Sequence, residues 1–367
     1  MYSYMKVGIL TFHRALNYGA VLQCYALQSS LEKLGVEVEV IDYENAFISK
    51  FYSPFYIEKM NPRKFAYMLY AFRSKIKRNR VFSQYRKKYL KLSKSTYTED
   101  TIKKSDTEYD VIIVGSDQVW NLEQTQGDLN YLLQFAETAN RVSYAASIGI
   151  EKLPESQYKD FERELKKFAA ISVREKSSVK IVRDVAKKDA VVSLDPTLLL
   201  SKKEWEAVAE PSAPIAHEKY ICVYKINSSK AYEYAAYLSK KTGLKVIAIK
   251  PDRTCPKAFQ KELYASPNDF LSYIRNATYV VTDSFHGTVF SILYEKQFIA
   301  CLDSRKNNKN TRIVELLEMV GLKECLIDSS EKIMDAIEND NDYVEVKKKI
   351  DVGQKESIRY LKDAINL

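Results

Sequence analysis

The sequence predicts an α/β protein built from two doubly wound domains, and three observations lead to this prediction. The chain has 367 residues, more than one ordinary hydrophobic core holds. Short β-branched runs alternate with amphipathic stretches almost from the first residue. The alternation stops at a Pro-containing stretch, EPSAPIAHEK, and then resumes. We therefore expect two halves of similar size that face each other across a cleft.

The first half begins with a strand, helix and strand unit. Val7 to Thr11 reads as a buried strand, and the stretch AVLQCYALQSSLEKL then has apolar residues three and four apart. This predicted helix stops at Gly35, and VEVEVID follows as the next strand. Such units build parallel sheets with right-handed crossovers.

Further buried strands follow after an interruption from about residue 45 to 108, which looks helical, aromatic and basic. DVIIVGSD, RVSYAASIG, AAISVRE and AVVSLDPT are compact apolar runs that we interpret as fully buried strands. Ligands of open parallel sheets bind beyond the carboxyl ends of the strands. We therefore expect site residues among Gly115 to Asp117, Ser147 to Gly149, Arg174 and Asp195.

The second half repeats the pattern, and we therefore predict a division of the chain into three segments. Residues 1–208 are expected to form the first domain, with a basic helical insertion at about 50–100. Residues 209–345 form the second domain, and 346–367 form a C-terminal helix that we expect to pack back on the first domain. Within the second domain, SPND predicts a helix start with Ser266 as cap, Pro267 at the first position and Asp269 in the first turn.

Composition limits the function classes. The formal charge of +9 favours anionic partners, and the five scattered cysteines indicate neither a zinc cage nor a disulfide framework. We find no signal-peptide pattern and no apolar stretch long enough to cross a membrane, so we expect a cytoplasmic protein. Residues 73–94 carry ten Lys or Arg and no acidic residue. This segment suits an anionic membrane surface, although a solvated helical face is favoured. We find no nucleic-acid-binding module. The sequence is also compatible with a homo-oligomer.

The sharpest feature is YVVTDSFHGT, in which a predicted buried strand from Tyr279 to Thr282 runs into the turn DSFHGT, after which VFSILYEK reads as a helix. Such a turn offers free backbone N–H groups and the positive helix end to an anion. His286 lies at this turn, where an imidazole can act as acid or base near neutral pH. In the alternative interpretation Asp283 or Ser284 only caps the helix and His286 packs in the core.

Other candidates follow the remaining predicted strands. His13, Asn17 and Gly19 follow the first strand, and Asp117 and Trp120 follow GSD. Trp120 could stack on a sugar, or equally belong to the core. No dinucleotide fingerprint and no GxxxxGK[ST] loop is present. Arg174 and Arg312 could each bind a phosphate or carboxylate through paired hydrogen bonds, or form ion pairs, Arg174 with Glu175 or Asp195 for example.

Six segments together resemble the polysaccharide pyruvyl transferase family. They are, in order, NYGAVLQCYALQ, DVIIVGSDQVWN, SYAASIG, ISVREKSS, LDPTLLL and TDSFHGTVFSILYEKQFI. The resemblance implies two Rossmann-like domains arranged as in GT-B glycosyltransferases. It also implies phosphoenolpyruvate as donor, a nucleotide- or lipid-linked sugar as acceptor, and neither a metal nor a bound cofactor. His286 matches the histidine of the family.

One departure is Ser284, because characterised ketal-forming members often carry an arginine two positions before the histidine. Another arginine, Arg174 or Arg312, would then bind the charge of the donor. We assign the remaining candidates on this basis. Catalysis is expected from His286, Asp117 and Arg174, donor binding from Ser284, Gly287, Thr288 and Arg312, and acceptor binding from His13, Asn17, Gly19 and Trp120. The alternatives are a glycosyltransferase with a nucleotide-sugar donor and a non-catalytic sugar- or phosphate-binding protein.

Overall fold

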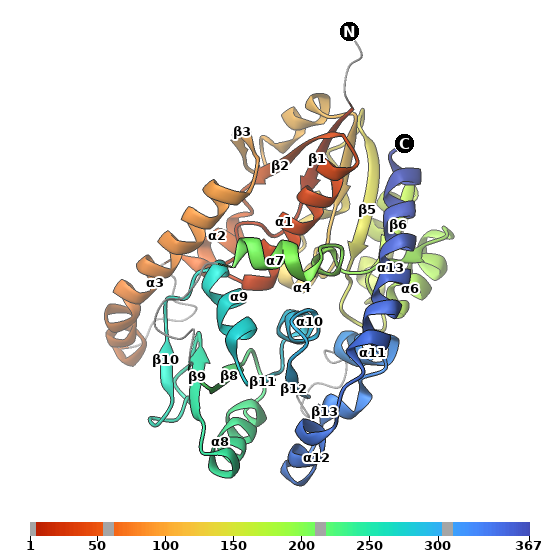
Figure 1. Ribbon diagram of the computed structural model, residues 1–367. Coiled ribbons are helices and arrows are strands. Elements are labelled where there is room, and N and C mark those ends of the chain that lie inside the picture. Colours follow the sequence, from red (N-terminus) through yellow and green to blue (C-terminus); the bar gives the residue numbers. More distant parts are fainter. Residues whose placement is uncertain (1–4, 54–61, 210–217, 303–310) are drawn as a thin grey trace. The chain divides into compact units, whose positions relative to one another are not determined.

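The protein divides into two compact units, which are drawn in Figure 1, a ribbon diagram of the computed structural model. Unit 1 comprises residues 1–199 and 353–367, and unit 2 comprises residues 200–352. The structure describes residues 5–53, 62–209, 218–302 and 311–367, with residues 62–71 described through their backbone alone. Each unit has its own parallel sheet and its own buried core.

The sheet of unit 1 has seven strands in the order β3-β2-β1-β4-β5-β6-β7, and all neighbouring strands are parallel. The strand order reverses between β1 and β4, where Val7 pairs with Val111 and Leu10 with Val114. The carboxyl ends of β1 and β4 therefore form the switch point of this sheet. The strands are β1 (Lys6–Leu10), β2 (Glu37–Tyr43), β3 (Leu92–Tyr97), β4 (Val111–Val114), β5 (Asn140–Ala146), β6 (Ala170–Val173) and β7 (Val191–Val192).

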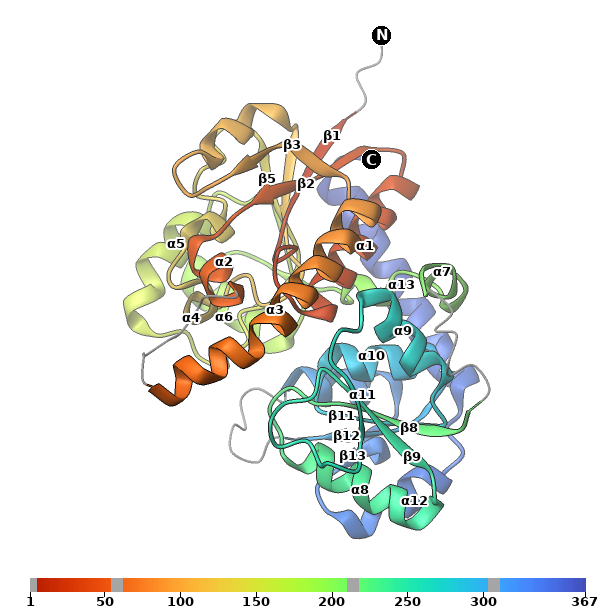
Figure 2. The same cartoon turned by 90° about the vertical axis from the view of Figure 1, so that its left-hand side faces the viewer.

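Helices cover both faces of this sheet. Helix α1 begins after Asn17, whose side-chain oxygen accepts hydrogen bonds from the N–H groups of Gly19 and Ala20. Helix α3 lies beside α1 in both Figure 1 and Figure 2, and Tyr18 contacts Phe82 with ring centroids 5.3 Å apart. The helices are α1 (Tyr18–Lys33), α2 (Ala46–Tyr52), α3 (Pro62–Tyr89), α4 (Leu122–Thr125), α5 (Tyr158–Leu165) and α6 (Lys176–Ala186).

The sheet of unit 2 has six parallel strands in the order β10-β9-β8-β11-β12-β13. Its order reverses between β8 and β11, so the second switch point lies where these two strands end. The strands are β8 (Tyr220–Tyr224), β9 (Lys245–Ile249), β10 (Gln260–Glu262), β11 (Tyr279–Thr282), β12 (Gln297–Cys301) and β13 (Leu326–Ile327). The helices are α7 (Lys202–Val208), α8 (Lys230–Thr242), α9 (Pro267–Asn276), α10 (Phe285–Leu293), α11 (Thr311–Val320), α12 (Ile333–Glu338) and α13 (Tyr343–Ala364).

The two doubly wound domains confirm the predicted fold class, while the boundary of the units falls at Leu199 and Leu200 instead of after residue 208. The Pro-containing stretch follows α7, but α7 belongs to unit 2. Trp205 of α7 contacts Phe290 with ring centroids 5.0 Å apart, and the side chain of Asn268 donates to the carbonyl of Val208. These contacts hold α7 in the core of unit 2. The boundary predicted from the Pro-containing stretch therefore lies one helix too far along the chain.

The last turns of α13 belong to unit 1, although the helix begins at Tyr343 within unit 2. The hydroxyl of Tyr360 donates to the carbonyl of Ser143 at 2.8 Å. The hydroxyl oxygen of Ser357 accepts a hydrogen bond of 3.0 Å from the N–H of Leu194, and Gln354 donates to the carbonyl of Leu198. The polar groups at the end of the chain are thus satisfied by loops and strands of the first sheet.

Two strand predictions need correction. The predicted helical insertion at about 50–100 contains α2 and α3, but it ends in β3, the edge strand of the first sheet. The run AVVSLDPT was predicted as a fully buried strand, yet it forms only β7, in which Val191 and Val192 are 47% and 48% exposed. It is the opposite edge strand of the sheet, and edge strands are commonly very short.

Candidate active site

The turn between β11 and α10 is held by a short chain of hydrogen bonds at the switch point of unit 2. The hydroxyl of Thr282 donates to the carbonyl of Tyr224 on β8 at 2.7 Å and accepts from the N–H of Ser284 at 3.0 Å. The hydroxyl oxygen of Ser284 in turn accepts from the N–H of Gly287 at 3.2 Å, so Ser284 is the N-cap of α10. The turn is therefore fixed to the neighbouring strand.

Asp283 reaches across to the loop that follows β8. Its Oδ1 accepts a hydrogen bond from the N–H of Ile226 at 2.6 Å. Its Oδ2 accepts from the N–H groups of Asn227 at 2.6 Å and Ser228 at 2.5 Å. Sequence reasoning considered Asp283 only as a helix cap and missed this clamp. The signal was available in the topology, because the two loops follow neighbouring strands of a predicted parallel sheet.

His286 and Arg312 both lie near the ring of Phe285. His286 is the second residue of α10, is 7% exposed and contacts Phe285 edge-on with ring centroids 5.2 Å apart. The guanidinium carbon of Arg312, in the first turn of α11, lies 6.0 Å from the centroid of the same Phe285 ring. An imidazole, a guanidinium group and a helix N-terminus without acidic residues thus gather in one place.

Gly287 and Thr288 shape this turn from within. A Cβ atom on Gly287 would collide with the side chain of Thr282, so only glycine lets α10 approach β11 this closely. The fully buried hydroxyl of Thr288 donates to the carbonyl of Ser284 at 3.1 Å. We predicted direct donor binding by these two residues, and the structure gives both of them a contact within the turn.

The structure brings together Asp117 and Arg174 at the carboxyl edge of the sheet in unit 1. Nη1 of Arg174 lies 2.9 Å from Oδ2 of Asp195, and Nη2 lies 3.6 Å from Oδ1 of Asp117. The Arg174 side chain is 2% exposed. Burial would lower the pKa of Arg174, but Asp195, Asp117 and Glu175 raise it. The ion pair with Asp195 that the sequence left as an alternative is present.

His13 does not offer its ring to solvent. It is fully buried, with Nε2 located 2.9 Å from Oδ1 of Asp42 and Nδ1 located 3.2 Å from the carbonyl of Thr11. Arg14 donates to both oxygens of Asp42 at 2.8 and 2.7 Å. Burial would raise the pKa of Asp42, but hydrogen bonds from His13, Arg14 and Thr96 hold it well below the ordinary value. The predicted role of His13 in acceptor binding does not fit this position.

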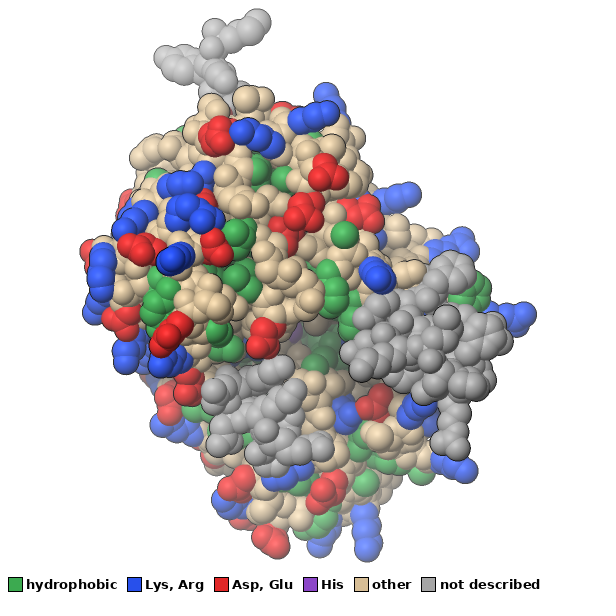
Figure 3. Space-filling model, turned by 180° about the vertical axis from the view of Figure 1, so that it is seen from behind, with side chains coloured by type: hydrophobic (Ala, Val, Ile, Leu, Met, Phe, Trp, Pro, Cys, Tyr) green, Lys and Arg blue, Asp and Glu red, His purple; other side chains and the backbone are tan. Residues whose placement is uncertain are grey.

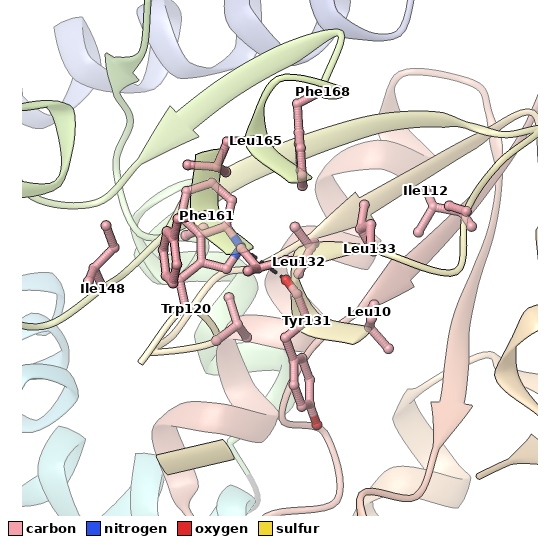
Figure 4. Close-up of a cluster of buried hydrophobic side chains, with 14 of the residues drawn as sticks. Leu10, Ile112, Trp120, Tyr131, Leu132, Leu133, Ile148, Phe161, Leu165 and Phe168 are labelled. Carbon is pink, nitrogen blue, oxygen red and sulfur yellow. Dashed lines mark hydrogen bonds between the residues drawn. The ribbon is translucent and has the colours of Figure 1, made fainter. Parts of the chain in front are cut away.

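The other three candidates for acceptor binding also have structural roles. Asn17 caps α1, and Gly19 is a buried residue in the first turn of that helix. Figure 4 shows Trp120 in the core near Phe161 and Leu165, with its indole N–H donating to the carbonyl of Tyr131 at 3.0 Å. Trp120 is 0% exposed and contacts Phe168 edge-on. Its ring is therefore not available to stack on a sugar.

Within the described ranges, no group of three or more His, Cys, Asp or Glu side chains could hold a metal ion. The five cysteines are free and buried, and burial raises the pKa of each thiol. None of the helices in the described part of the chain has the length and apolar character that crossing a membrane requires.

Comparison with solved structures places the fold in a class. The chain resembles MnaA of S. aureus in a co-structure with UDP, with a TM-score of 0.55 and 11% identity over 99% of this chain and 97% of that one. A putative UDP-N-acetylglucosamine 2-epimerase from Listeria monocytogenes gives a TM-score of 0.53 and 10% identity over 96% and 91%. The UDP-GlcNAc 2-epimerase of Methanocaldococcus jannaschii in complex with UDP-GlcNAc and UDP gives 0.52 and 14% over 95% and 99%. The likeness shows two Rossmann-like domains.

A family comparison then identifies the protein more closely. The model of the polysaccharide pyruvyl transferase family matches residues 17–305, which include the switch point of unit 2 and the whole DSFHGT turn. The chain belongs to this family, and it is a transferase. A search of curated proteins gave no significant match.

Proposed function

We propose that the enzyme transfers pyruvate from phosphoenolpyruvate to a sugar of a surface polysaccharide precursor and forms a cyclic pyruvate ketal. The observation that carries this proposal is the placement of His286 and Arg312 around Phe285, at the N-terminus of α10, in a chain of this family. Phosphoenolpyruvate has a phosphate and a carboxylate. A guanidinium group and a helix N-terminus are the groups that bind such anions.

The reaction needs one proton donor and one stabiliser of positive charge. Protonation of the methylene carbon of phosphoenolpyruvate makes the neighbouring carbon cationic, and a first sugar hydroxyl adds to it and loses its own proton. A second hydroxyl of the same sugar then displaces inorganic phosphate, and the ring of the ketal closes. One sugar and one phosphoenolpyruvate thus give one ketal and one phosphate. His286 delivers the proton, because an imidazole can be either acid or base near neutral pH.

Backbone N–H groups of the turn, together with Arg312, bind and orient the donor in this proposal. We assign the phosphate or carboxylate of phosphoenolpyruvate to the backbone N–H groups at the start of α10 and to Arg312. In this proposal Arg312 supplies the positive charge that other family members often have in an arginine at the position of Ser284. Ser284, Gly287 and Thr288 keep the turn in shape through the contacts described above. Asp117, whose side chain is 16% exposed, remains our candidate for orienting the acceptor.

Phosphorus NMR tests this proposal directly. The enzyme is mixed with phosphoenolpyruvate and a panel of nucleotide-linked and lipid-linked sugars, and inorganic phosphate is expected to appear with one acceptor only. Release of a nucleotide from a sugar nucleotide, without any use of phosphoenolpyruvate, would contradict the proposal. That outcome would favour a glycosyltransferase with a nucleotide-sugar donor; two of the proteins of similar fold are bound to UDP. Ligand binding with no product of either kind would instead indicate a non-catalytic protein.

A further inference from the structure

Helix α3 of unit 1 has two faces of different character. Its inner face is aromatic: Phe82 contacts Tyr18 of α1, and Tyr89 contacts Tyr25 with ring centroids 6.0 Å apart. Phe82 and Tyr85 are buried at 0% and 2% exposure. Phe82 and Tyr89 therefore anchor the helix to α1.

The outer face of α3 is basic. Arg73, Arg80 and Lys87 are exposed and lie seven residues apart, which is close to two turns of an α-helix, so they share one face. The complete exposed stripe consists of Arg73, Ile76, Lys77, Arg80, Gln84, Lys87 and Lys88. The sequence from Arg73 to Lys94 contains no acidic residue that could neutralise this stripe from within the segment. By contrast, acidic and basic side chains are mixed on the face of the molecule that Figure 3 shows.

We propose that the outer stripe of α3 docks the enzyme on an anionic lipid bilayer. The charge is complementary, because clusters of Lys and Arg on an amphipathic helix are attracted to anionic headgroups. Ile76, between Arg73 and Lys77 in the stripe, is 45% exposed and can enter the headgroup region. Single-stranded nucleic acid suits the stripe less well, since its binding draws on aromatic rings for base stacking and the rings of α3 named above face α1. The inference goes beyond the proposed reaction and does not depend on it.

Cosedimentation with lipid vesicles tests the proposal on the full chain. The wild-type protein should bind vesicles that contain phosphatidylglycerol, should not bind vesicles of phosphatidylcholine alone, and should be released by added salt. The test variant combines Arg73→Gln, Arg80→Gln and Lys87→Gln. Each basic side chain near an anionic leaflet is worth roughly fivefold in partitioning, so the triple variant should bind on the order of 100-fold more weakly.

A matched control separates this stripe from net charge. The control variant combines Lys180→Gln, Lys240→Gln and Lys241→Gln, which remove an equal number of positive charges from exposed positions on α6 and α8. This variant should keep most of the binding to vesicles. Equal losses in the two triple variants would overturn the proposal, as would absence of wild-type binding to the anionic vesicles. Tighter binding to duplex or single-stranded DNA than to those vesicles at the same ionic strength would overturn it in favour of a nucleic acid. All substituted side chains are exposed, and circular dichroism confirms that each variant is folded.

Discussion

The two switch points handle charge in opposite ways. At the edge of the first sheet, charged side chains neutralise one another: Arg174 is paired with Asp195, and Asp42 with Arg14 and His13. At the edge of the second sheet, the Asp283 carboxylate is bound by three backbone N–H groups, and the nearby α10 N-terminus has no acidic residue. The comparison teaches that Arg174, Asp195, Asp42 and Arg14 are paired within unit 1, whereas unit 2 places Arg312 near the start of α10, where we propose that an anion binds.

The largest expected effect on stability comes from Arg174. Arg174→Ala leaves the buried carboxylate of Asp195 without its counter-ion, so we expect a loss of about 3–5 kcal/mol in the free energy of unfolding. The control is Arg183→Ala on the exposed face of α6, which should stay within about 0.5 kcal/mol of wild type. Urea denaturation measures both. Equal stabilities of the two variants would show that the pair does not hold the first sheet edge together.

Asp283 tests the opposite arrangement in unit 2. Asp283→Asn removes the negative charge that three backbone N–H groups share, and we expect a loss of about 2 kcal/mol in unfolding free energy. The turnover number should also fall, because the turn that holds His286 loses its tie to the loop after β8. Asp328→Asn, at an exposed position paired with Lys332, should change neither quantity appreciably. An Asp283→Asn variant that unfolds and turns over like Asp328→Asn would remove the clamp from the account.

The third prediction concerns binding of phosphoenolpyruvate by Arg312 in unit 2. Arg312→Ala should raise the KM for phosphoenolpyruvate about 10- to 100-fold, since it removes a charge-assisted contact to the donor. The unfolding free energy should change little, because the residue is only partly buried. Arg275→Ala in the last turn of α9 removes a similar charge from the same unit and should leave the KM near its wild-type value. Steady-state kinetics decide the point, and a KM that rises equally in both variants would speak against donor binding by Arg312.

The smallest expected effect is a change in how the melting temperature depends on pH, and it concerns Asp42. The pKa of Asp42 is below its ordinary value of 3.8 in the folded protein, so its ionised form stabilises unit 1. This contribution is fully present above the ordinary pKa and is lost as the pH falls below about 3.8 toward the folded value. The melting temperature of wild type should therefore drop more steeply with acidification than that of Asp42→Asn. Parallel curves for the two proteins would contradict the assignment.

Sequence patterns predicted the positions of helices and strands well, but they predicted the surroundings of individual side chains less well. The apolar runs placed β1, β4, β8 and β11 at the observed positions, and Ser266, Pro267 and Asp269 form the predicted helix start with a complete capping box. These features are local, since they depend on spacing along the chain. The helix after the DSFHGT turn was predicted only from VFSILYEK onward, whereas α10 already begins at Phe285, so His286 lies in its first turn.

The roles of His13, Trp120 and Asp283 could not be predicted in this way. Whether a side chain after a strand points into the core or toward solvent depends on the segments that pack against it, as with Trp120, which contacts Phe168 and shares a core cluster with Phe161 of α5. The clamp of Asp283 joins residues 55 to 57 positions apart in the sequence, so it follows from strand order and not from spacing. The cleft expected between the two halves and the roles of the site residues stay predictions.

The central claim is that the imidazole of His286 transfers the proton in the reaction of phosphoenolpyruvate. The most direct measurement is phosphate release from phosphoenolpyruvate by His286→Ala and His286→Gln, with the acceptor that the NMR panel identifies. We predict that both variants melt near the wild-type temperature and release phosphate at least about 100-fold more slowly. Near-normal phosphate release by either folded variant would contradict the claim.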